Sequence, residues 1–271
     1  MTAIKFSRKH LGIPYALFLA MFVVFPLLLI IFYAFTDANG AFTFANFASF
    51  FKSATNIRVL LRSLGLAFLT TTICLLLAYP AAYILANSSL NKNGVMLLLF
   101  ILPMWINFVL RTAAMKELLY LLGFYKSGDL SYVNTLIGMV YDYLPVTILP
   151  LYTVLLKMDK SVKEASYDLG ARPATTFLKT TLPLSMPGVV SAITMVFLPT
   201  TTSYVISDTL GNSKVTIIGK LIENRFNSGE AGSWNAGSAI ALILLVFIFA
   251  TMLISGKFTE NDNSARGSGL W

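Results

Sequence analysis

The sequence predicts an all-α integral membrane protein with six transmembrane helices, and three observations lead to this fold class. Of the 271 residues, 56% are hydrophobic and 12% are charged, about half the charge of soluble domains. Six apolar segments reach the ~20 residues needed to cross the hydrocarbon core of a bilayer. A polar, helix-prone stretch separates the fourth of these segments from the fifth. We therefore expect the lipid bilayer to surround most of the chain.

The six predicted spans follow one another through the whole chain, so residues 1–271 are interpreted as one transmembrane domain. The first run is too long for the core of a signal peptide and has no small-x-small cleavage site. Most spans contain proline, which favours either a kink or a helix that lines a wet cavity. The spans are 14–35, 64–85, 95–115, 136–156, 188–206 and 236–254.

Basic residues predict the orientation, because cytoplasmic loops are enriched in lysine and arginine. An even number of spans places both termini on one side, together with the polar stretch. The first helix has a clearly basic N-terminal flank, whereas the opposite side is less basic by a small margin. We expect both termini in the cytoplasm, on the side that holds Lys5, Arg8, Lys9, Lys92, Lys157, Lys160, Lys163, Arg172, Lys179, Lys257 and Arg266.

The remaining polar segments are short. Residues 37–62 and 207–235 face outward in this arrangement, and each has room for short interfacial helices or strands to which an extracellular binding protein could dock. The polar tail, 257–271, is assigned no function. The net charge of +8 is scattered over loops, so it does not indicate a nucleic-acid partner.

Several kinds of chemistry are excluded by residue counts. Cys74 is the only cysteine and His10 the only histidine, so neither an internal disulfide nor a histidine or cysteine metal site is expected. The segment 211–220 lacks the spacing of a phosphate-binding loop. The chain therefore has no visible means of hydrolysing ATP, and we expect no catalytic residue and no cofactor in it.

The polar stretch at about 157–187 has the local signals of two helices. Ser161 with Glu164 three residues later predicts a capping box that opens the first helix. Gly170 is a plausible C-terminal stop, Pro173 suits the first position of a second helix, and Pro183 is expected to end that helix.

One face of the first predicted helix is apolar, because Val162, Ala165 and Leu169 recur at helical spacing. An amphipathic helix that lies on the membrane surface would show the same pattern. The small residues nearby would also let the backbone of a partner approach closely, which favours a docking surface. The two-part pattern, with the Leu-Pro pair after it, favours docking.

The segment Glu164-Ala-Ser-Tyr-Asp-Leu-Gly-Ala-Arg172, with Leu182-Pro183 and Pro187-Gly188 after it, resembles the cytoplasmic "EAA" loop of ABC importer permeases. The resemblance implies the type I ABC importer permease fold, with a coupling helix between helices 4 and 5 that sits in a groove of a separate ATPase subunit. The residues it implicates in this coupling are Glu164, Ala165, Ser166, Asp168, Leu169 and Gly170.

Two further segments narrow the resemblance. Pro103-Met-Trp-Ile-Asn-Phe-Val-Leu-Arg111 and Tyr204-Val-Ile-Ser-Asp208-Thr-Leu-Gly211 are similar to stretches of the PotB-type spermidine/putrescine permeases. This family implies a multi-pass protein of the bacterial cell membrane, a second, PotC-type permease and an extracytoplasmic polyamine-binding protein. It also implies an ATPase subunit dimer that binds ATP and Mg²⁺.

The chain departs from the family pattern in three places. Ser166 stands where alanine is commonest, Asn212 replaces a second glycine, and Asp142 has no firm counterpart. Related permeases for thiamine, iron, sulfate or phosphate share the loop, so another small solute stays an alternative. An ATP-independent secondary transporter or channel is a further alternative, although the two halves show no repeat. A membrane-embedded enzyme would need a catalytic set that is absent from the sequence.

Ionisable residues inside spans are costly, so the acids of the membrane zone are functional candidates. A polyamine carries several hydrated ammonium groups, which need carboxylates or aromatic faces in a low-dielectric path. Asp142 could instead pair with Arg111, Asp208 could lie at the water interface, and aromatic residues at span ends are often anchors. The predicted substrate-pathway residues are Asp142, Asp208, Tyr204, Trp105, Tyr141 and Tyr143.

Overall fold

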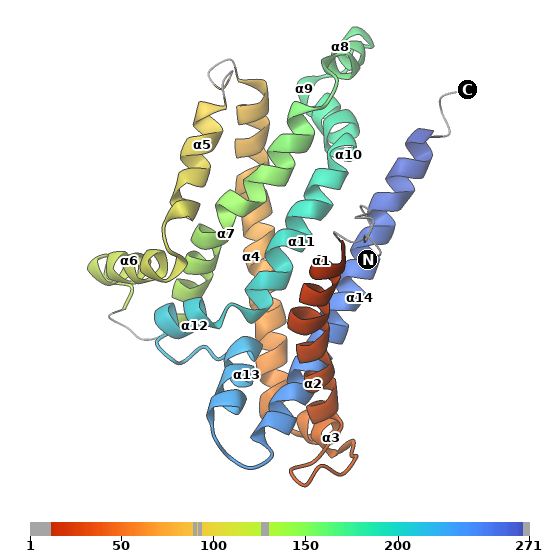
Figure 1. The fold of residues 1–271 in the computed structure, drawn as a ribbon. Helices are drawn as coiled ribbons and strands as arrows, with labels where there is room; N and C mark the ends of the chain where they lie inside the picture. The colour runs from red at the N-terminus through yellow and green to blue at the C-terminus, as the bar shows by residue number, and fades with distance from the viewer. Residues whose placement is uncertain (1–11, 89–90, 92–93, 126–129, 268–271) are drawn as a thin grey trace, which may run out of the picture. The chain divides into compact units, whose positions relative to one another are not determined.

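A computed structural model of the chain is helical almost throughout its described part (Figure 1). It describes residues 12–88, 91, 94–125 and 130–267, and side chains between 14 and 253. The basic segment 1–10, Lys92, Lys126 and the end of the polar tail, 268–271, lie outside the described residues. The chain divides into two compact units, one of residues 1–57 with 221–247 and one of 58–220 with 248–271.

Helix length and composition give between four and six spans in the described chain, a range that includes the predicted six. Four helical segments of the described chain are long and apolar enough to cross a membrane, and two bent helix pairs raise the number to six if each pair is one span. The four are 14–34, α4 (Ala54–Asn87), α7 (Ser131–Leu156) and the apolar part of α14 (Ser233–Gly267). Large hydrophobic side chains are exposed along these helices, as expected for contact with lipid.

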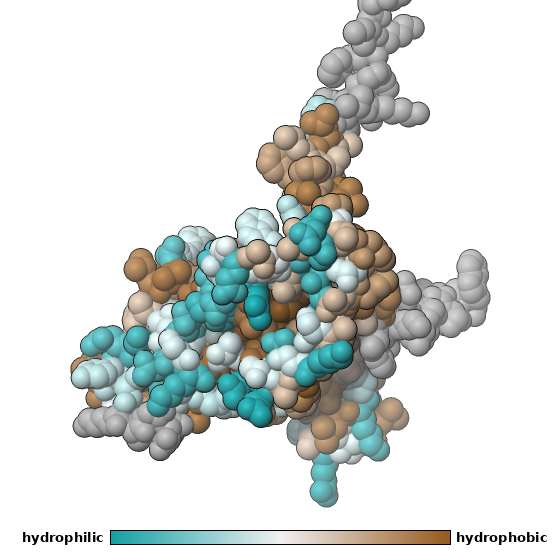
Figure 2. Space-filling model, turned by 90° about the horizontal axis from the view of Figure 1, so that it is seen from below, coloured by the Kyte–Doolittle hydropathy of each residue, from teal (hydrophilic) through white to brown (hydrophobic). Residues whose placement is uncertain are grey.

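The first unit begins with α1 (Gly12–Leu19), the π-helical turn η2 (Ala20–Val24) and α2 (Phe25–Ala34). The two segments predicted to face outward contain short helices, α3 (Ala45–Lys52) and α13 (Ile218–Asn227), and α13 starts in the second unit. Two asparagines satisfy backbone carbonyls that follow α2, because Asn46 and Asn235 each donate to Thr36 O, at 2.8 and 2.7 Å. Seen from below, hydrophilic residues lie among neutral and hydrophobic ones (Figure 2).

The second unit is built on α4, α7 and α11 (Met186–Thr202). One buried cluster joins the three helices through Ala82, Leu151 and Ala192. Helix α11 lies along α7, and Gly188 allows the close approach, because a Cβ there would lie 3.1 Å from Val154 and 3.2 Å from the carbonyl oxygen of Pro150. Small residues at such contacts are typical of membrane helix packing.

The third predicted span, 95–115, is wrong as a continuous helix. Helix α5 (Val95–Ile101) and the 3₁₀ turn η4 (Leu102–Trp105) form its first part, which ends at Trp105. Helix α6 (Phe108–Leu121) then runs at 92° to them. The side chain of Asn107 starts the new helix by accepting hydrogen bonds from the N–H groups of Val109 and Leu110, at 2.9 and 3.4 Å. The fifth span also ends early, at Thr202, before the separate helix α12 (Tyr204–Leu210).

The polar stretch forms α8 (Lys160–Asp168), α9 (Pro173–Thr176), the π-helical turn η5 (Phe177–Thr181) and α10 (Leu182–Leu184). The prediction that Pro173 begins the second helix is confirmed. The helix predicted to end at Pro183 ends one residue later, at Leu184, before a bend of 63° into α11. Proline lacks an N–H, and a π-helical turn ends two residues before Pro183, as η2 does before Pro26.

Candidate functional site

Helix α8 is the first candidate site, and its N-terminus is held by Asp159. Asp159 has extended backbone angles, and its carboxylate accepts the N–H of Ser161 at 2.9 Å. The predicted capping box is therefore wrong, because Ser161 already lies inside the helix and the residue before Lys160 is the cap. This hydrogen bond favours the carboxylate form and lowers the pKa of Asp159.

The predicted stop at Gly170 is confirmed by the backbone. Gly170 has φ +80°, a left-handed conformation that favours glycine. Its N–H donates to the carbonyl of Tyr167 at 2.8 Å, and the N–H of Ala171 donates to that of Ser166 at 3.1 Å. This is the Schellman pattern, so both ends of the short helix are closed.

The inner side of α8 is attached to the rest of the second unit at two points. Lys163 Nζ donates to Asn87 Oδ1 at 2.9 Å and lies 4.9 Å from the centre of the Tyr83 ring on α4. Burial, and then the charge of Lys160, lower the pKa of Lys163. Ser166, which stands where the family most often has alanine, shares a 2.9 Å hydrogen bond with Thr176. This bond links α8 to α9.

A chain of aromatic contacts continues from this attachment into α4. Phe177 of η5 meets the rings of Tyr83 and Tyr79 edge to face, at 5.7 and 5.6 Å between centroids. The hydroxyl of Tyr79 lies 2.6 Å from that of Ser185, which precedes α11. These contacts connect the segment after α8 to α4 and to the residue that precedes α11.

The outer side of α8 has no partner within the described chain. Leu169 is 88% exposed, and Glu164, Ala165 and Asp168 are exposed as well. The adjoining pocket of about 410 Å³ is mostly apolar in its lining. A short helix closed at both ends, attached on one side and exposed on the other is suited to contact a second protein. The pocket is lined by Val154, Lys157, Met158, Asp159, Val162, Leu184 and Pro187.

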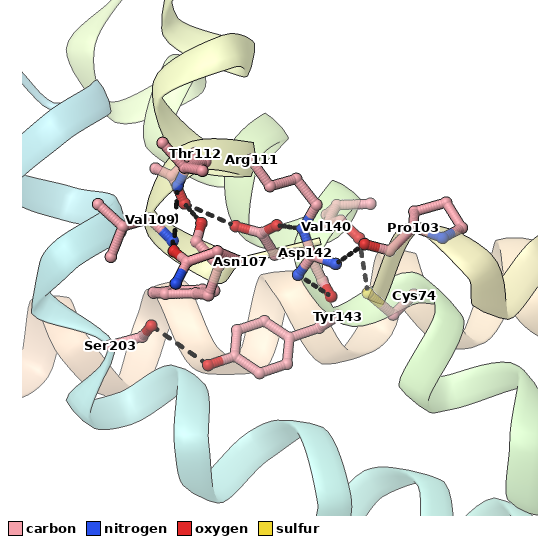
Figure 3. A network of polar contacts seen from close by, with 12 residues as sticks. Cys74, Pro103, Asn107, Val109, Arg111, Thr112, Val140, Asp142, Tyr143 and Ser203 are labelled. Atoms are coloured by element: carbon pink, nitrogen blue, oxygen red, sulfur yellow. Dashed lines mark hydrogen bonds and ion pairs between the residues drawn. The ribbon is translucent and has the colours of Figure 1, made fainter. Parts of the chain in front are cut away.

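Asp142 is the centre of a buried polar network in the second unit (Figure 3). Its carboxylate pairs with Arg111 Nε and accepts a hydrogen bond from Thr112 at 3.1 Å. Arg111 also donates to the carbonyl of Pro103 at 3.0 Å, which holds α6 against the turn before it. The side chains of Arg111 and Asp142 are 8% and 1% exposed. The network therefore stabilises the sharp bend at Asn107. Arg111, which the sequence offered as an alternative partner of Asp142, is the partner observed.

The aromatic neighbours of Asp142 point to different contacts. The guanidinium of Arg111 lies 5.7 Å from the centre of the Tyr141 ring. The hydroxyl of Tyr143 donates to Ser203, in the break between α11 and α12, at 3.2 Å. Trp105 is 83% exposed and lines an apolar pocket with Leu98, Ile101 and Leu102.

Asp208 and Tyr204 form the second acidic and aromatic site, one helical turn apart on α12. Lys220 of α13 joins them. Its Nζ lies 3.3 Å from Asp208 Oδ2 and 5.6 Å from the centre of the Tyr204 ring. The side chains of Lys220 and Asp208 are 25% and 41% exposed, so water reaches this pair. Two pairs of the six predicted pathway residues therefore lie near each other. Asp208 and Tyr204 share a contact with Lys220, and Asp142 and Tyr141 share a contact with Arg111.

Sequence reasoning missed Lys163 and Lys220, because each meets its partners on another helix that only the fold brings near. A positive residue among polar neighbours is too common a signal to identify either. In the part of the chain that the structure describes, no three His, Cys, Asp or Glu side chains gather in a group that could hold a metal ion.

Comparisons with known proteins agree with this architecture. The family model described as "Binding-protein-dependent transport system inner membrane component" matches residues 78–259. The spermidine/putrescine transport system permease protein PotB of Haemophilus influenzae is 31% identical over 93% of this chain and 96% of its own length. The protein of the same name from Escherichia coli is 32% identical over 88% of this chain and 96% of its own length.

A solved structure shares the fold at low sequence identity. A chain of a bacterial alginate ABC transporter, in complex with a periplasmic protein bound to an alginate pentasaccharide, superposes with a TM-score of 0.73 at 14% identity, covering 93% of both chains. The family model matches more than half of the sequence, and the relatives align over most of both chains. The helical fold, with its bent helix pairs, agrees with both findings. This chain belongs to the family of inner membrane components of binding-protein-dependent transport systems.

Proposed function

We propose that this chain is one permease subunit of an ATP-driven importer of polyamines such as spermidine and putrescine. The observation that carries the proposal is the likeness to PotB proteins of two bacteria, at 31–32% identity, over nearly the whole of both chains. The carboxylate and ring of Asp208 and Tyr204 suit an ammonium group, which supports the substrate class.

Helix α8 is proposed as the coupling helix. Its exposed outer face would sit in a groove of a separate ATPase subunit, and its attachment through Lys163 and Ser166 would pass the motion of that subunit to the spans. The ATPase dimer would bind ATP and Mg²⁺ and perform the hydrolysis, so this chain is not itself the enzyme. Both termini and α8 would then lie in the cytoplasm.

Transport would follow alternating access. A polyamine-binding protein delivers the substrate from outside to a pair of permeases, of which the second is PotC-type. ATP binding closes the ATPase dimer, and α8 transmits the closure so that the cavity opens outward. Hydrolysis returns the pair to the inward-open state, which releases the cation. A permease for another small solute is the second candidate, because the coupling loop is shared across the superfamily.

The test is uptake of labelled spermidine into proteoliposomes that hold this chain, its second permease and the ATPase, with the binding protein added outside. We expect uptake that requires ATP and is blocked by excess unlabelled putrescine or spermidine, with thiamine and sulfate as controls. ATP hydrolysis without spermidine uptake would overturn the substrate class and leave the permease role. Uptake by this chain alone without ATP would overturn the coupling role of α8.

A further inference from the structure

Lys220 places an ammonium group where the substrate's own ammonium is expected. Its Nζ lies 3.3 Å from Asp208 Oδ2 and 5.6 Å from the centre of the Tyr204 ring. A carboxylate beside an aromatic face is the combination that recognises an amine cation. The site that would receive the substrate is thus filled by a side chain of the protein itself.

The backbone around Lys220 is held firmly by buried contacts. Gly219 packs so closely on the carbonyl of Thr202 that any Cβ would overlap it. The N–H of Ile218 donates to Ser63 Oγ at 2.7 Å, in a buried hydrogen bond between α13 and α4. The start of α13 is therefore fixed against α4 and the end of α11, and the fold directs the lysine toward α12.

The ion pair of Lys220 with Asp208 is much more accessible to solvent than the pair of Arg111 with Asp142. Lys220 and Asp208 are 25% and 41% exposed, and solvent weakens such pairs, whereas Arg111 and Asp142 are 8% and 1% exposed. Lys220 also lies in the first turn of α13, where the helix dipole disfavours a positive charge. Of the two acids predicted for the pathway, Asp208 is the one whose cation can be exchanged.

We infer that Lys220 is a resident cation that competes with an ammonium group of the substrate for Asp208 and Tyr204. Arrival of the substrate displaces the lysine toward water, and its departure lets the lysine return. The carboxylate therefore has a cation in both states and is never left uncompensated. Because the lysine is tethered, its effective concentration at the site is high, and it sets the affinity for the incoming amine. This inference rests on the proposed polyamine substrate.

The experiment measures binding of labelled spermidine to the complete complex of this chain, its second permease and the ATPase in nanodiscs, with a non-hydrolysable ATP analogue and no binding protein. Lys220→Met is expected to lower the Kd about three- to fivefold, the scale of a partly exposed ion pair. Lys220→Arg keeps a tethered cation and is expected to bind no more tightly than the wild type. Lys116→Met, an exposed lysine of α6, is the matched control and should leave the Kd unchanged.

A double substitution separates competition from a structural effect. In an Asp208→Asn background, Lys220→Met is expected to bring no further gain, because the contested carboxylate is gone. A Kd for Lys220→Met equal to or above the wild-type value, or a gain that persists in the Asp208→Asn background, overturns the inference. Lys220→Gln replaces the methionine variant if the latter fails to assemble, with the same outcomes. A wild-type complex that neither binds nor transports spermidine overturns the proposed function instead.

Discussion

The two acids predicted in the membrane zone behave differently at the scale of single residues. Asp142 is buried and engaged by Arg111 and Thr112, so it stabilises the bend between η4 and α6. Asp208 is partly exposed, and it pairs with Lys220 at a distance of 3.3 Å. A buried pair that loses one member leaves an uncompensated charge, whereas an exposed pair that loses one member is compensated by water.

Replacing Arg111 by Met is expected to destabilise the protein by about 3–5 kcal/mol, because Asp142 remains buried without its cation. Thermal unfolding of the purified protein in detergent measures the effect as a lower Tm. Lys116→Met on the same helix is the control and should leave Tm unchanged. The double variant Arg111→Met with Asp142→Leu should regain most of the loss. An unchanged Tm for Arg111→Met alone would contradict the structural role of the pair.

Asp208→Asn is expected to reduce spermidine uptake roughly tenfold, equivalent to about 1.4 kcal/mol, while the complex still assembles. Removing the charge weakens attraction for an ammonium group, and the exposed pair with Lys220 contributes at most ~1 kcal/mol to stability. The measurement is the initial uptake rate in proteoliposomes. Glu117→Gln, on an exposed part of α6, serves as control. Normal uptake by Asp208→Asn would remove it from the pathway.

At the scale of elements, α8 is stabilised by its two ends and its inner side rather than by a buried core. None of its residues is buried, and it is only 9 residues long. An isolated helix this short is marginal in water. The Asp159 cap, the Gly170 stop and the attachments of Lys163 and Ser166 stabilise it instead.

Gly170→Val is expected to weaken association with the ATPase about 5- to 30-fold. A β-branched residue at φ +80° costs roughly 1–2 kcal/mol, so the end of α8 would open. Binding of the permease pair to the purified ATPase measures this change. Gly170→Asn is the matched variant, since asparagine tolerates the left-handed conformation, and it should bind nearly as well as the wild type. Equal binding by the valine variant would show that this end of α8 does not contribute.

Lys163→Met is expected to lower the number of spermidine molecules imported per ATP hydrolysed, while the ATPase still associates. The variant removes the link to Asn87 and Tyr83 and leaves the outer face of α8 intact. Parallel assays of uptake and phosphate release give the ratio. Lys160→Met, an exposed lysine of the same helix, should keep the wild-type ratio. A loss shared by both variants would point to net charge rather than to the link.

At the scale of the whole molecule, the polar helix α8 and the outward loop around Asn39 are expected on opposite sides of the membrane. Cys74 is the only cysteine and is buried, so the native protein should resist a membrane-impermeant maleimide. In whole cells whose outer membrane has been permeabilised, Asn39→Cys should react with the maleimide at once. Asp168→Cys should react only after the inner membrane is opened. The reverse pattern would invert the proposed topology.

Features that depend on local composition and spacing could be predicted from the sequence. Apolar runs of sufficient length predicted the spans, because the bilayer thickness alone sets that length. The stop at Gly170 and the helix start at Pro173 followed from backbone preferences of single residues. These signals do not depend on what lies across the fold.

Contacts between residues far apart in the chain could be identified only in the folded protein. Arg111 and Asp142 are 31 positions apart, and their pairing, together with the Asn107 cap, turns a predicted straight span into a 92° bend. Lys220 reaches Asp208 because Gly219 packs against Thr202, a contact that has no periodic signature in the chain. A charge is compensated by whichever opposite charge the fold brings near it, and that choice depends on packing between helices rather than on neighbours in sequence.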